Sequence, residues 1–442
     1  MLREEDIAIE LKCQPYVCNS YLRDQEEKQS ALLFESRQET KEVRCPYCQG
    51  NVYADGYGNV TLKDMPVWYG MAQELTFLCH RYECTRCGKK FTEDVPLRHP
   101  GTKVTERAAR WIQAMLRFKV SIRSIQKLTG IHWETIRNLH LEIMEDTLER
   151  HMAELKASGY RPKFLAVDEF SIRKGHTYAT CVMDLETGEV LWVGEGRSKD
   201  DFEQFFKETE ADFLTDVMAV AMDMNASYHL LVKKHLPGAE IVYDRYHMQA
   251  QFGKDVLGAV RLSEARVHKE RSLAVKKTIA DLQGEERKRA KEEARQEQQQ
   301  YSQMKKLRWT LLTKADSLSE SRAAHLAEIL DSHSDLAVCY AMKEEMCGLF
   351  DLRDPAAAEL GWKKWFAAAK ESGIPALVKF AELKEKRIDG LIAHAIYPIS
   401  TGKLEGFNNK IKVAKRLAYG YRNNHFFFTL VRFLSIPLPN FP

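Results

Sequence analysis

The middle of the chain alternates short apolar runs with polar segments whose apolar residues recur at helical spacing. Apolar runs of this length, set between glycine and proline residues, are typical of buried strands. Five strands are predicted, at residues 163–170, 177–184, 189–194, 217–222 and 239–243. Helices are predicted between the last three strands, at 200–209 and 226–235. An antiparallel meander that continues through helices into parallel strands gives one mixed sheet with helices on its faces.

Three of the predicted strands run into carboxylates. Asp168 lies near the end of the first strand, Asp223 follows the fourth and Asp244 follows the fifth. A buried carboxylate stays charged only if it meets solvent, a partner or a metal ion. A strand-end aspartate that merely caps the next turn is the alternative interpretation. The predicted sheet can bring Asp168 and Asp223 together.

About 150 residues after these strands carry helical patterns and no strand signal. The segment 263–308 is dense in charge and predicts one solvated helix supported by i,i+4 pairs. Further helices are predicted at 317–331, 334–350, 354–372 and 375–388. Trp362 and Trp365 are expected in their core. The pattern indicates an all-helical insertion into the sheet domain.

A helix is predicted from about residue 403 to 417, with Ser400 or Thr401 as its cap. Its apolar stripe consists of Leu404, Phe407, Ile411 and Ala414. The opposite stripe is assigned to Glu405, Asn408, Asn409, Lys412 and Arg416. A solvated face with salt bridges explains this second stripe less well, because Glu405 and Lys412 are two turns apart and cannot form an i,i+4 pair.

Near the start of the chain, two Cys-x-x-Cys pairs predict a zinc site. The four residues are Cys45, Cys48, Cys84 and Cys87. Each pair places two thiolates on a tight turn, and two such turns complete a tetrahedral site. Strand-like pieces at 51–60 and 75–79 fit a zinc ribbon with a hairpin insertion. A redox function is less well supported, because there are two pairs and no surrounding βαβ pattern.

Two details refine this zinc prediction. Gly50 and Gly88 follow the two pairs closely, as knuckle turns require. Cys79 and His80 are alternative ligands, although a buried cysteine and a surface histidine explain them more simply.

The segment from about residue 105 to 150 is predicted to be helical and to contain a helix-turn-helix. A helix at 121–129 with Ser121 as N-cap ends at Gly130, and a second helix follows. In such a unit the first residues of the second helix read bases in the major groove. Here these residues are His132, Trp133, Thr135, Arg137 and Asn138. An ordinary helical hairpin is the alternative.

The length, composition and charge of the chain bear on the number of domains and on the classes of partner that the protein can have. The 442 residues are 44% apolar, which allows several cores and suggests about three domains. With 66 basic and 63 acidic residues, the formal charge of +3 gives no overall argument for nucleic acid, so any basic surface must be local. No apolar run approaches a membrane span and the charged start is unlike a signal peptide, so a soluble, cytoplasmic protein without membrane partners is expected. The polar, mixed composition of residues 1–40 predicts a weak helix or a disordered start to the chain.

Taken together, the motifs resemble the ISL-three family of bacterial insertion-sequence transposases. The resemblance rests on the cysteine pairs, the helix-turn-helix, Val-Asp168-Glu-Phe, Tyr-Asp244-Arg-Tyr-His247 and Ser-Thr-Gly-Lys-Leu-Glu405-Gly-Phe-Asn-Asn-Lys-Ile-Lys. It covers nearly the whole chain. It implies a DDE enzyme with a ribonuclease H-like catalytic domain, in which a helical insertion precedes the last acidic residue.

Matched motif by motif, Asp168, Asp223 and Glu405 take the places of the three catalytic acids. Asp244 competes with Asp223 for the second place, and Asp244 with His247 otherwise forms an accessory motif. The three acids are expected to bind magnesium or manganese, because two such ions can activate the nucleophile and stabilise the leaving oxygen. Asn409, Lys412 and Arg416 are expected to contact the DNA backbone.

The predicted fold is therefore multidomain α/β. Its expected parts are an N-terminal extension (1–40), a zinc ribbon (41–100), a helix-turn-helix domain (101–160), the first part of the catalytic domain (161–260), a helical insertion (261–395) and the last part of the catalytic domain (396–442). The expected partners are the element's terminal inverted repeats and target DNA, with a homodimer or larger synaptic assembly. A non-catalytic DNA-binding regulator and a nuclease that cuts without joining are the alternative functions.

Overall fold

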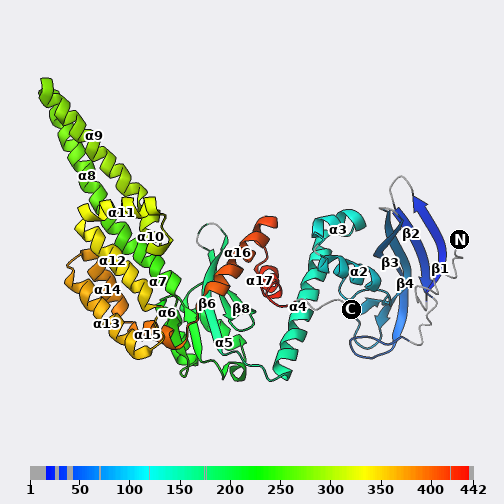
Figure 1. Ribbon diagram of the computed structural model, residues 1–442. Coiled ribbons are helices and arrows are strands. Elements are labelled where there is room, and N and C mark those ends of the chain that lie inside the picture. Colours follow the sequence, from blue (N-terminus) through cyan, green and yellow to red (C-terminus); the bar gives the residue numbers. More distant parts are fainter. Residues whose placement is uncertain are drawn as a thin grey trace. The chain divides into compact units, whose positions relative to one another are not determined.

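The computed structural model describes residues 16–24, 29–36, 43–68, 71–118, 120–173, 175, 177–418 and 420–437 (Figure 1). The chain forms two compact units, Met1–His151 and Met152–Pro442. Each unit has its own sheet and its own hydrophobic core. Among the described helices, none combines the length and the apolar character that crossing a membrane requires.

The sheet of the first unit has the strand order β1-β2-β4-β3, and β5 pairs with β4. The strands are β1 (Tyr16–Asp24), β2 (Gln29–Ser36), β3 (Val52–Trp68), β4 (Met71–Cys84) and β5 (Lys90–Thr92). The β3–β4 hairpin is antiparallel, while β2 runs parallel to β4. The prediction of a weak helix or disorder within residues 1–40 was wrong for its described part, which pairs as the β1–β2 hairpin.

Three helices follow: α2 (Glu106–Arg117), α3 (Ile122–Thr129) and α4 (Trp133–Ala157). As predicted, Ser121 caps α3 by accepting a hydrogen bond from the backbone of Ser124, and Gly130 ends it in the left-handed conformation. Ile112, Ile125 and Ile136, one from each helix, are fully buried in a shared core. This core fixes the angle at which α4 leaves the turn after Gly130.

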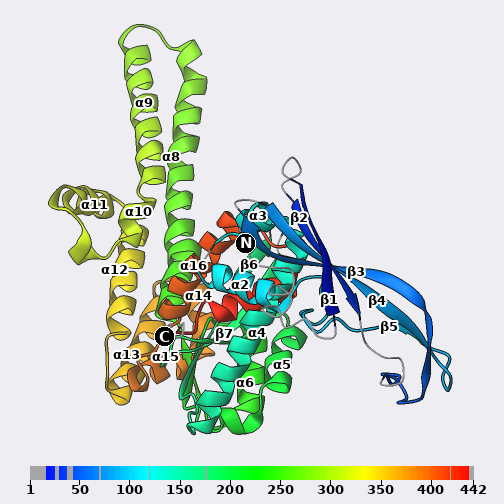
Figure 2. The same cartoon turned by 90° about the vertical axis from the view of Figure 1, so that its right-hand side faces the viewer.

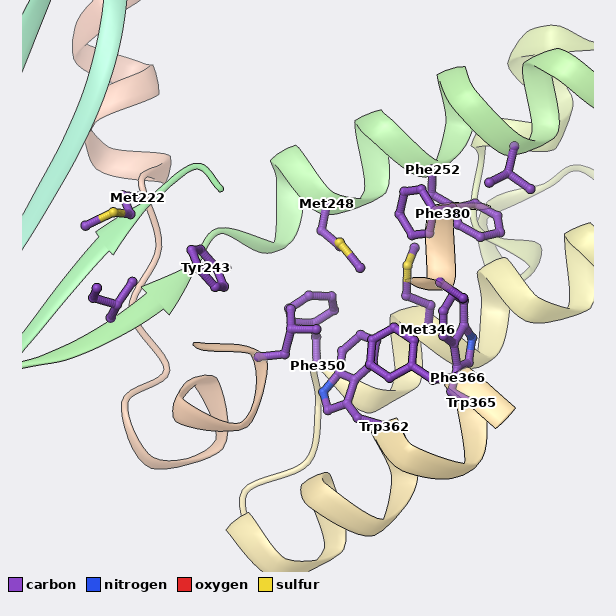
Figure 3. Close-up of a cluster of buried hydrophobic side chains, with 14 of the residues drawn as sticks. Met222, Tyr243, Met248, Phe252, Met346, Phe350, Trp362, Trp365, Phe366 and Phe380 are labelled. Atoms are coloured by element: carbon purple, nitrogen blue, oxygen red, sulfur yellow. The ribbon is translucent and has the colours of Figure 1, made fainter. Parts of the chain in front are cut away.

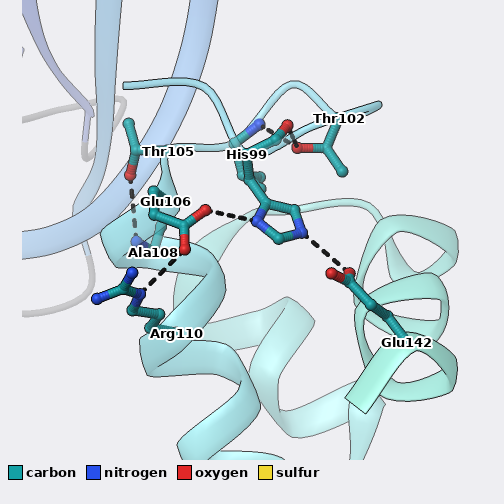
Figure 4. A network of polar contacts seen from close by, with 8 residues as sticks. His99, Thr102, Thr105, Glu106, Ala108, Arg110 and Glu142 are labelled. Carbon is teal, nitrogen blue, oxygen red and sulfur yellow. Dashed lines mark hydrogen bonds and ion pairs between the residues drawn. The ribbon is translucent and has the colours of Figure 1, made fainter. Parts of the chain in front are cut away.

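A histidine joins two of these helices to the preceding segment (Figure 4). His99 Nδ1 lies 2.7 Å from Glu106 Oε2 on α2, and His99 Nε2 lies 2.9 Å from Glu142 Oε2 on α4. Burial alone would lower the pKa of His99, but hydrogen bonds and charge attraction from Glu106 and Glu142 leave it raised. The contacts therefore favour a charged His99 bridging two carboxylates.

The sheet of the second unit has the strand order β10-β9-β6-β7-β8. Its strands are β6 (Phe164–Arg173), β7 (Thr177–Asp184), β8 (Val190–Glu195), β9 (Ala219–Met222) and β10 (Glu240–Tyr243). The first three form an antiparallel meander, and β9 and β10 extend it in parallel from β6. The predicted mixed sheet is confirmed, with the predicted order of strands and helices.

Helices cover both faces of this sheet. α5 (Lys199–Glu208) and α6 (Ala226–His235) contribute Phe202, Phe205 and Leu231 to the core on one face. On the other face, α16 (Gly402–Leu417) and α17 (Asn424–Phe433) pack Leu404, Ile411 and Phe427 against β6 and β7. Segments that lie more than 150 residues apart in the sequence thus form one layered domain.

An all-helical segment separates β10 from α16. It contains α7 (Arg245–Phe252), a π-helical turn (Gly253–Leu257), α8 (Gly258–Thr278), α9 (Gly284–Lys306), α10 (Arg308–Leu312), α11 (Glu320–Ser332), α12 (Ser334–Leu349), α13 (Pro355–Glu371), α14 (Pro375–Glu385) and α15 (Ile388–Ile396). Its core is continuous with that of the sheet, from Tyr243 through Phe252 to Trp362 and Trp365 (Figure 3). Both tryptophans are fully buried, as predicted.

The prediction of one long charged helix over 263–308 was wrong. The chain breaks after Thr278 through a short 3-10 turn, Ile279–Asp281, and restarts at Gly284. α8 and α9 lie side by side as a hairpin (Figures 1 and 2). Ala290 and Ala294 of α9 are buried, and Ser272 of α8 donates a hydrogen bond to the Ala294 carbonyl.

Candidate active site and metal centre

The ends of two parallel strands bring Asp168 and Asp223 next to each other. Val167 of β6 pairs with Met222 of β9, and Asp168 and Asp223 directly follow these two residues in the sequence. Asp168 continues in β6, whereas β9 ends at Met222 and leaves Asp223 exposed. The register alone therefore places the two carboxylates at one edge of the sheet.

The Asp168 carboxylate is largely buried, with 15% of its side chain exposed. Asn408 donates its Nδ2 to Asp168 Oδ2 over 2.9 Å, and His247 Nε2 lies 3.9 Å from Asp168 Oδ1. Burial raises the pKa of Asp168 to about 6, and the nearby Glu169 and Asp223 carboxylates act in the same direction. His247 and the backbone N–H of Glu169 oppose this increase. The site thus concentrates negative charge that favours a bound cation.

Helix α16 places Glu405 on its exposed side and packs its other side on the sheet. Leu404, Asn408 and Ile411 are buried, with exposed fractions of 0%, 6% and 1%. The assignment of Asn408 to the Glu405 stripe was therefore wrong, because its side chain points into the buried face and reaches Asp168. Asn408 is the residue that the sequence interpretation missed, and its position four residues after buried Leu404 and three before buried Ile411 was the available signal.

Asp244 has a different environment from Asp223. It is 2% exposed, and its Oδ1 accepts a hydrogen bond from the backbone of His247 at 3.1 Å, which caps α7. Its Oδ2 accepts from the backbone N–H of Thr401 at 2.8 Å. Asp223 Oδ1 accepts from the neighbouring backbone N–H of Met224 at 2.6 Å. Asp244 thus connects the end of β10 to the start of α16.

The Thr401–Asp244 contact also corrects the predicted cap of this helix. Thr401 occupies the N-cap position of α16, but its side chain makes no capping hydrogen bond. Ser400 Oγ accepts from the backbone N–H of Gly402 at 3.3 Å. The buried Asp244 carboxylate anchors the start of the helix instead.

The structure does not bring all three predicted acids into metal-binding distance. Within the described ranges, one group of at least three histidine, cysteine or carboxylate ligands has its ligand atoms within 4.8 Å of one another, and it consists of the four cysteines. Asp168 and Asp223 are neighbours by register, and the helix that carries Glu405 is joined to Asp168 through Asn408.

The four cysteines Cys45, Cys48, Cys84 and Cys87 lie where two knuckle turns meet at the end of the β3–β4 hairpin. The Cys45–Cys87 sulfur distance is 3.7 Å, and the Cys48–Cys84 distance is 3.5 Å. Zinc–sulfur bonds of about 2.3 Å in a tetrahedron put the sulfurs about 3.8 Å apart, so the cluster fits zinc.

The surroundings of Cys84, one of the four sulfurs, also favour a thiolate. Backbone N–H groups of Cys87 and Arg86 point at Cys84 Sγ and lower its pKa to about 6. At Gly50, a Cβ atom would lie 3.2 Å from Cys48 Sγ and 3.3 Å from Cys84 Sγ. The alternative ligands lie outside this cluster: Cys79 contacts the Phe77 carbonyl, and His80 contacts Glu93.

The predicted base-reading residues lie at the start of α4. His132 and Trp133 are exposed, with Trp133 45% exposed, and Thr135 is half-buried. The Arg137 guanidinium lies 5.3 Å from the centre of the Trp133 ring, and its Nη2 donates to Asn138 Oδ1 at 2.9 Å. These contacts hold Arg137 and Asn138 as one polar group beside an exposed aromatic ring.

Beyond Glu405, the exposed side of α16 carries the residues expected to contact DNA. Asn409, Lys412 and Arg416 are all exposed. Lys412 Nζ donates to Asn409 Oδ1 at 3.1 Å. The arrangement places positive charge along the same helix as Glu405, which suits phosphate binding.

Comparison with known proteins agrees with this architecture. Residues 165–431, more than half of the chain, match a family model described as Transposase, of the DDE type and the ISL-three group. The transposase for insertion sequence element IS1001 of Bordetella parapertussis is 31% identical over 380 residues, which span 84% of this chain and 83% of that protein. The transposase for insertion sequence element IS1557 of Mycobacterium tuberculosis, strain H37Rv, is 25% identical over 318 residues, or 70% and 67% of the two chains.

The chain belongs to the ISL-three family of insertion-sequence transposases. It is a DNA transposase, an enzyme of the DDE class.

Proposed function

We propose that this transposase cuts the DNA at the ends of its element and joins them to target DNA, with Asp168, Asp223 and Glu405 as its catalytic acids. The observation that carries the assignment is the β6–β9 register, which sets Asp168 beside Asp223, together with the Asn408 contact that ties the Glu405 helix to Asp168. The sheet would then be the ribonuclease H-like core, interrupted by the helical insertion.

Carboxylates are ligands that magnesium and manganese prefer, and the three acids, Glu405 with the two aspartates, would have to move closer together to share the ions. Both ions prefer oxygen ligands, and their charge would offset the burial and the neighbouring carboxylates that raise the pKa of Asp168. When bound, such ions supply an activated water or 3′-hydroxyl and stabilise the leaving oxygen. Asp168 and Asp223 are held at one edge of the sheet. Glu405 lies on α16, which follows the helical insertion in the sequence and packs on the sheet.

Asp223 is the better second acid on structural grounds. Both carboxylate oxygens of Asp244 accept backbone hydrogen bonds, and the side chain is buried, so Asp244 has less free lone-pair capacity and less access for a metal ion than the exposed Asp223. Asp223 is exposed and adjacent to Asp168. Asp244 then serves as the anchor between β10 and α16, and His247 orients the Asp168 carboxylate or the DNA strand.

The first unit is proposed to recognise the element ends. A zinc ion on the four cysteines would hold the two knuckles together, and α3 with the start of α4 would act as the helix-turn-helix. The exposed Trp133 and the Arg137–Asn138 pair support this role. Because two element ends must be held in one complex, we expect a homodimer or a larger assembly. Because the substrate is chromosomal DNA, we expect the enzyme to act in the bacterial cytoplasm.

A cleavage-and-joining assay on the element's own ends tests this function. Metal-dependent nicking followed by joining of a pre-cleaved end to target DNA is the expected result. Nicking without joining would identify a nuclease. Specific end binding with neither reaction would identify a regulator.

A further inference from the structure

Two histidines of the helical insertion face each other, and neither belongs to the proposed catalytic site. His268 lies on α8, and His333 lies at the turn between α11 and α12. Their Nε2 atoms are 3.3 Å apart, and their ring planes are inclined by 64°. His268 is 14% exposed at its side chain, so the pair is shielded but can be reached from solvent.

The other ring nitrogens fix the protonation pattern. His268 Nδ1 lies 2.6 Å from the Glu297 carboxylate on α9, and His333 Nδ1 lies 2.9 Å from the Ile329 carbonyl on α11. A carboxylate and a carbonyl accept hydrogen bonds, so both Nδ1 atoms carry the hydrogen. In two neutral rings the Nε2 lone pairs would then point at each other. This arrangement is repulsive unless a cation lies between them.

The geometry favours a metal ion as that cation. Two zinc–nitrogen bonds of about 2.0–2.1 Å at a tetrahedral angle put the nitrogens about 3.3–3.4 Å apart. Metal-binding histidines usually donate their second ring N–H to a carboxylate or a backbone carbonyl, and both partners are present here. Imidazole suits zinc, nickel and copper and does not suit magnesium.

We propose that His268 and His333 bind a divalent transition-metal ion, with zinc as the preferred ion, through their Nε2 atoms. In the described part of the chain no third histidine, cysteine or carboxylate completes a group here with ligand atoms within 4.8 Å, so water fills the remaining positions. Bound metal connects α8 with the α11–α12 turn, while Glu297 of α9 positions the His268 ring. The site therefore fastens the α8–α9 hairpin to the rest of the insertion (Figure 1).

Calorimetric titration of zinc into the full-length protein, already carrying zinc at its cysteines, tests this site. The wild type should bind one more equivalent than His268→Gln or His333→Gln, and zinc should raise the unfolding temperature of the wild type alone. His325→Gln removes an exposed histidine of α11 and should bind zinc as the wild type does. Glu297→Gln keeps both ligands and should weaken binding by roughly 10-fold.

Melting curves recorded with a chelator establish that the variants fold. Equal zinc binding by the wild type and by folded His268→Gln and His333→Gln would overturn the proposal. Absence of the additional equivalent in the wild type would also overturn it, and would leave a shared proton as the cation between the rings.

Discussion

Asn408 donates its side-chain Nδ2 to Oδ2 of Asp168 over 2.9 Å, which joins α16 to β6 across 240 positions of sequence. Asn408 is 6% exposed, and its Oδ1 has no hydrogen-bond partner among the described residues. A buried amide oxygen without a hydrogen bond costs stability, so packing alone does not favour asparagine at this position. Here it holds the Asp168 carboxylate in one orientation and sets the distance between β6 and the Glu405 helix.

Asn408→Ala should lower DNA cleavage by roughly 10- to 100-fold, as loss of outer contacts does at other metal sites, and should raise the magnesium concentration needed for half-maximal rate. Val413→Ala, which alters an exposed residue of the same helix, is the matched control. Cleavage rates are measured across a magnesium series. Wild-type rates for Asn408→Ala at every concentration would show that the contact only supports packing.

Cys84→Ser should remove zinc from the first unit, because serine replaces a thiolate ligand of the four-cysteine cluster. Metal analysis of the full-length protein measures the loss. Cys79→Ser changes a buried cysteine outside the cluster and should retain that zinc. If both variants carry as much zinc as the wild type, the four cysteines are not the ligands.

Arg137→Ala should weaken binding to the element's own ends by roughly 1–3 kcal/mol if the guanidinium reads a base. Arg150→Ala, further along α4, is the control, because both arginines pair with an acid of the same helix: Arg137 with Glu134 and Arg150 with Asp146. Binding is measured on cognate and random DNA over a salt series, because phosphate contacts release counterions and weaken as salt rises. An equal loss on both DNAs would make Arg137 a phosphate contact.

The His99 bridge should make the first unit less stable at alkaline pH. Its folded-state pKa is raised, so its stabilisation is fully present below the unfolded value of about 6.5 and is lost as pH rises through the folded value. The difference in unfolding temperature between wild type and His99→Gln should therefore shrink as pH increases from about 6 to about 9. A difference that stays constant with pH would mean that His99 acts through packing and neutral hydrogen bonds.

Sequence patterns predicted the central sheet because its strands contain short apolar runs and are separated by clear turn residues. They also predicted the caps of α3, since Ser121 and Gly130 are chemically specific. The α8–α9 break was missed because charge continues through it, and the buried alanines that pair the two helices give a weak apolar signal. Strands β1 and β2 were missed because the polar composition of the first 40 residues hid their pairing.

The candidate site was only partly predictable for a similar reason. The two strand-end aspartates follow from apolar runs, but their neighbouring positions depend on the β6–β9 register, which no local pattern specifies. The different roles proposed for Asp223, as a catalytic acid, and Asp244, as a structural anchor, depend on a hydrogen bond from the backbone of Thr401 to Asp244. Thr401 lies more than 150 residues after either aspartate in the sequence. Asn408 was placed on the wrong face because its polarity was given more weight than its spacing from Leu404 and Ile411.

The assignment of Asp168, Asp223 and Glu405 as the catalytic acids is tested most directly by measuring how variants of these residues cleave the element's own ends. Asp168→Ala, Asp223→Ala and Glu405→Ala should each abolish cleavage while leaving end binding nearly unchanged, because each loses a metal ligand and balancing charge. Asp168→Ala should also lower the unfolding temperature, because it removes the acceptor of the buried Asn408 amide. Asp244→Asn keeps an acceptor for the α7 cap but disturbs the Thr401 contact, so it should lower the unfolding temperature and retain measurable cleavage. Loss of cleavage in a folded Asp244→Asn enzyme, with cleavage retained in Asp223→Ala, would contradict the assignment.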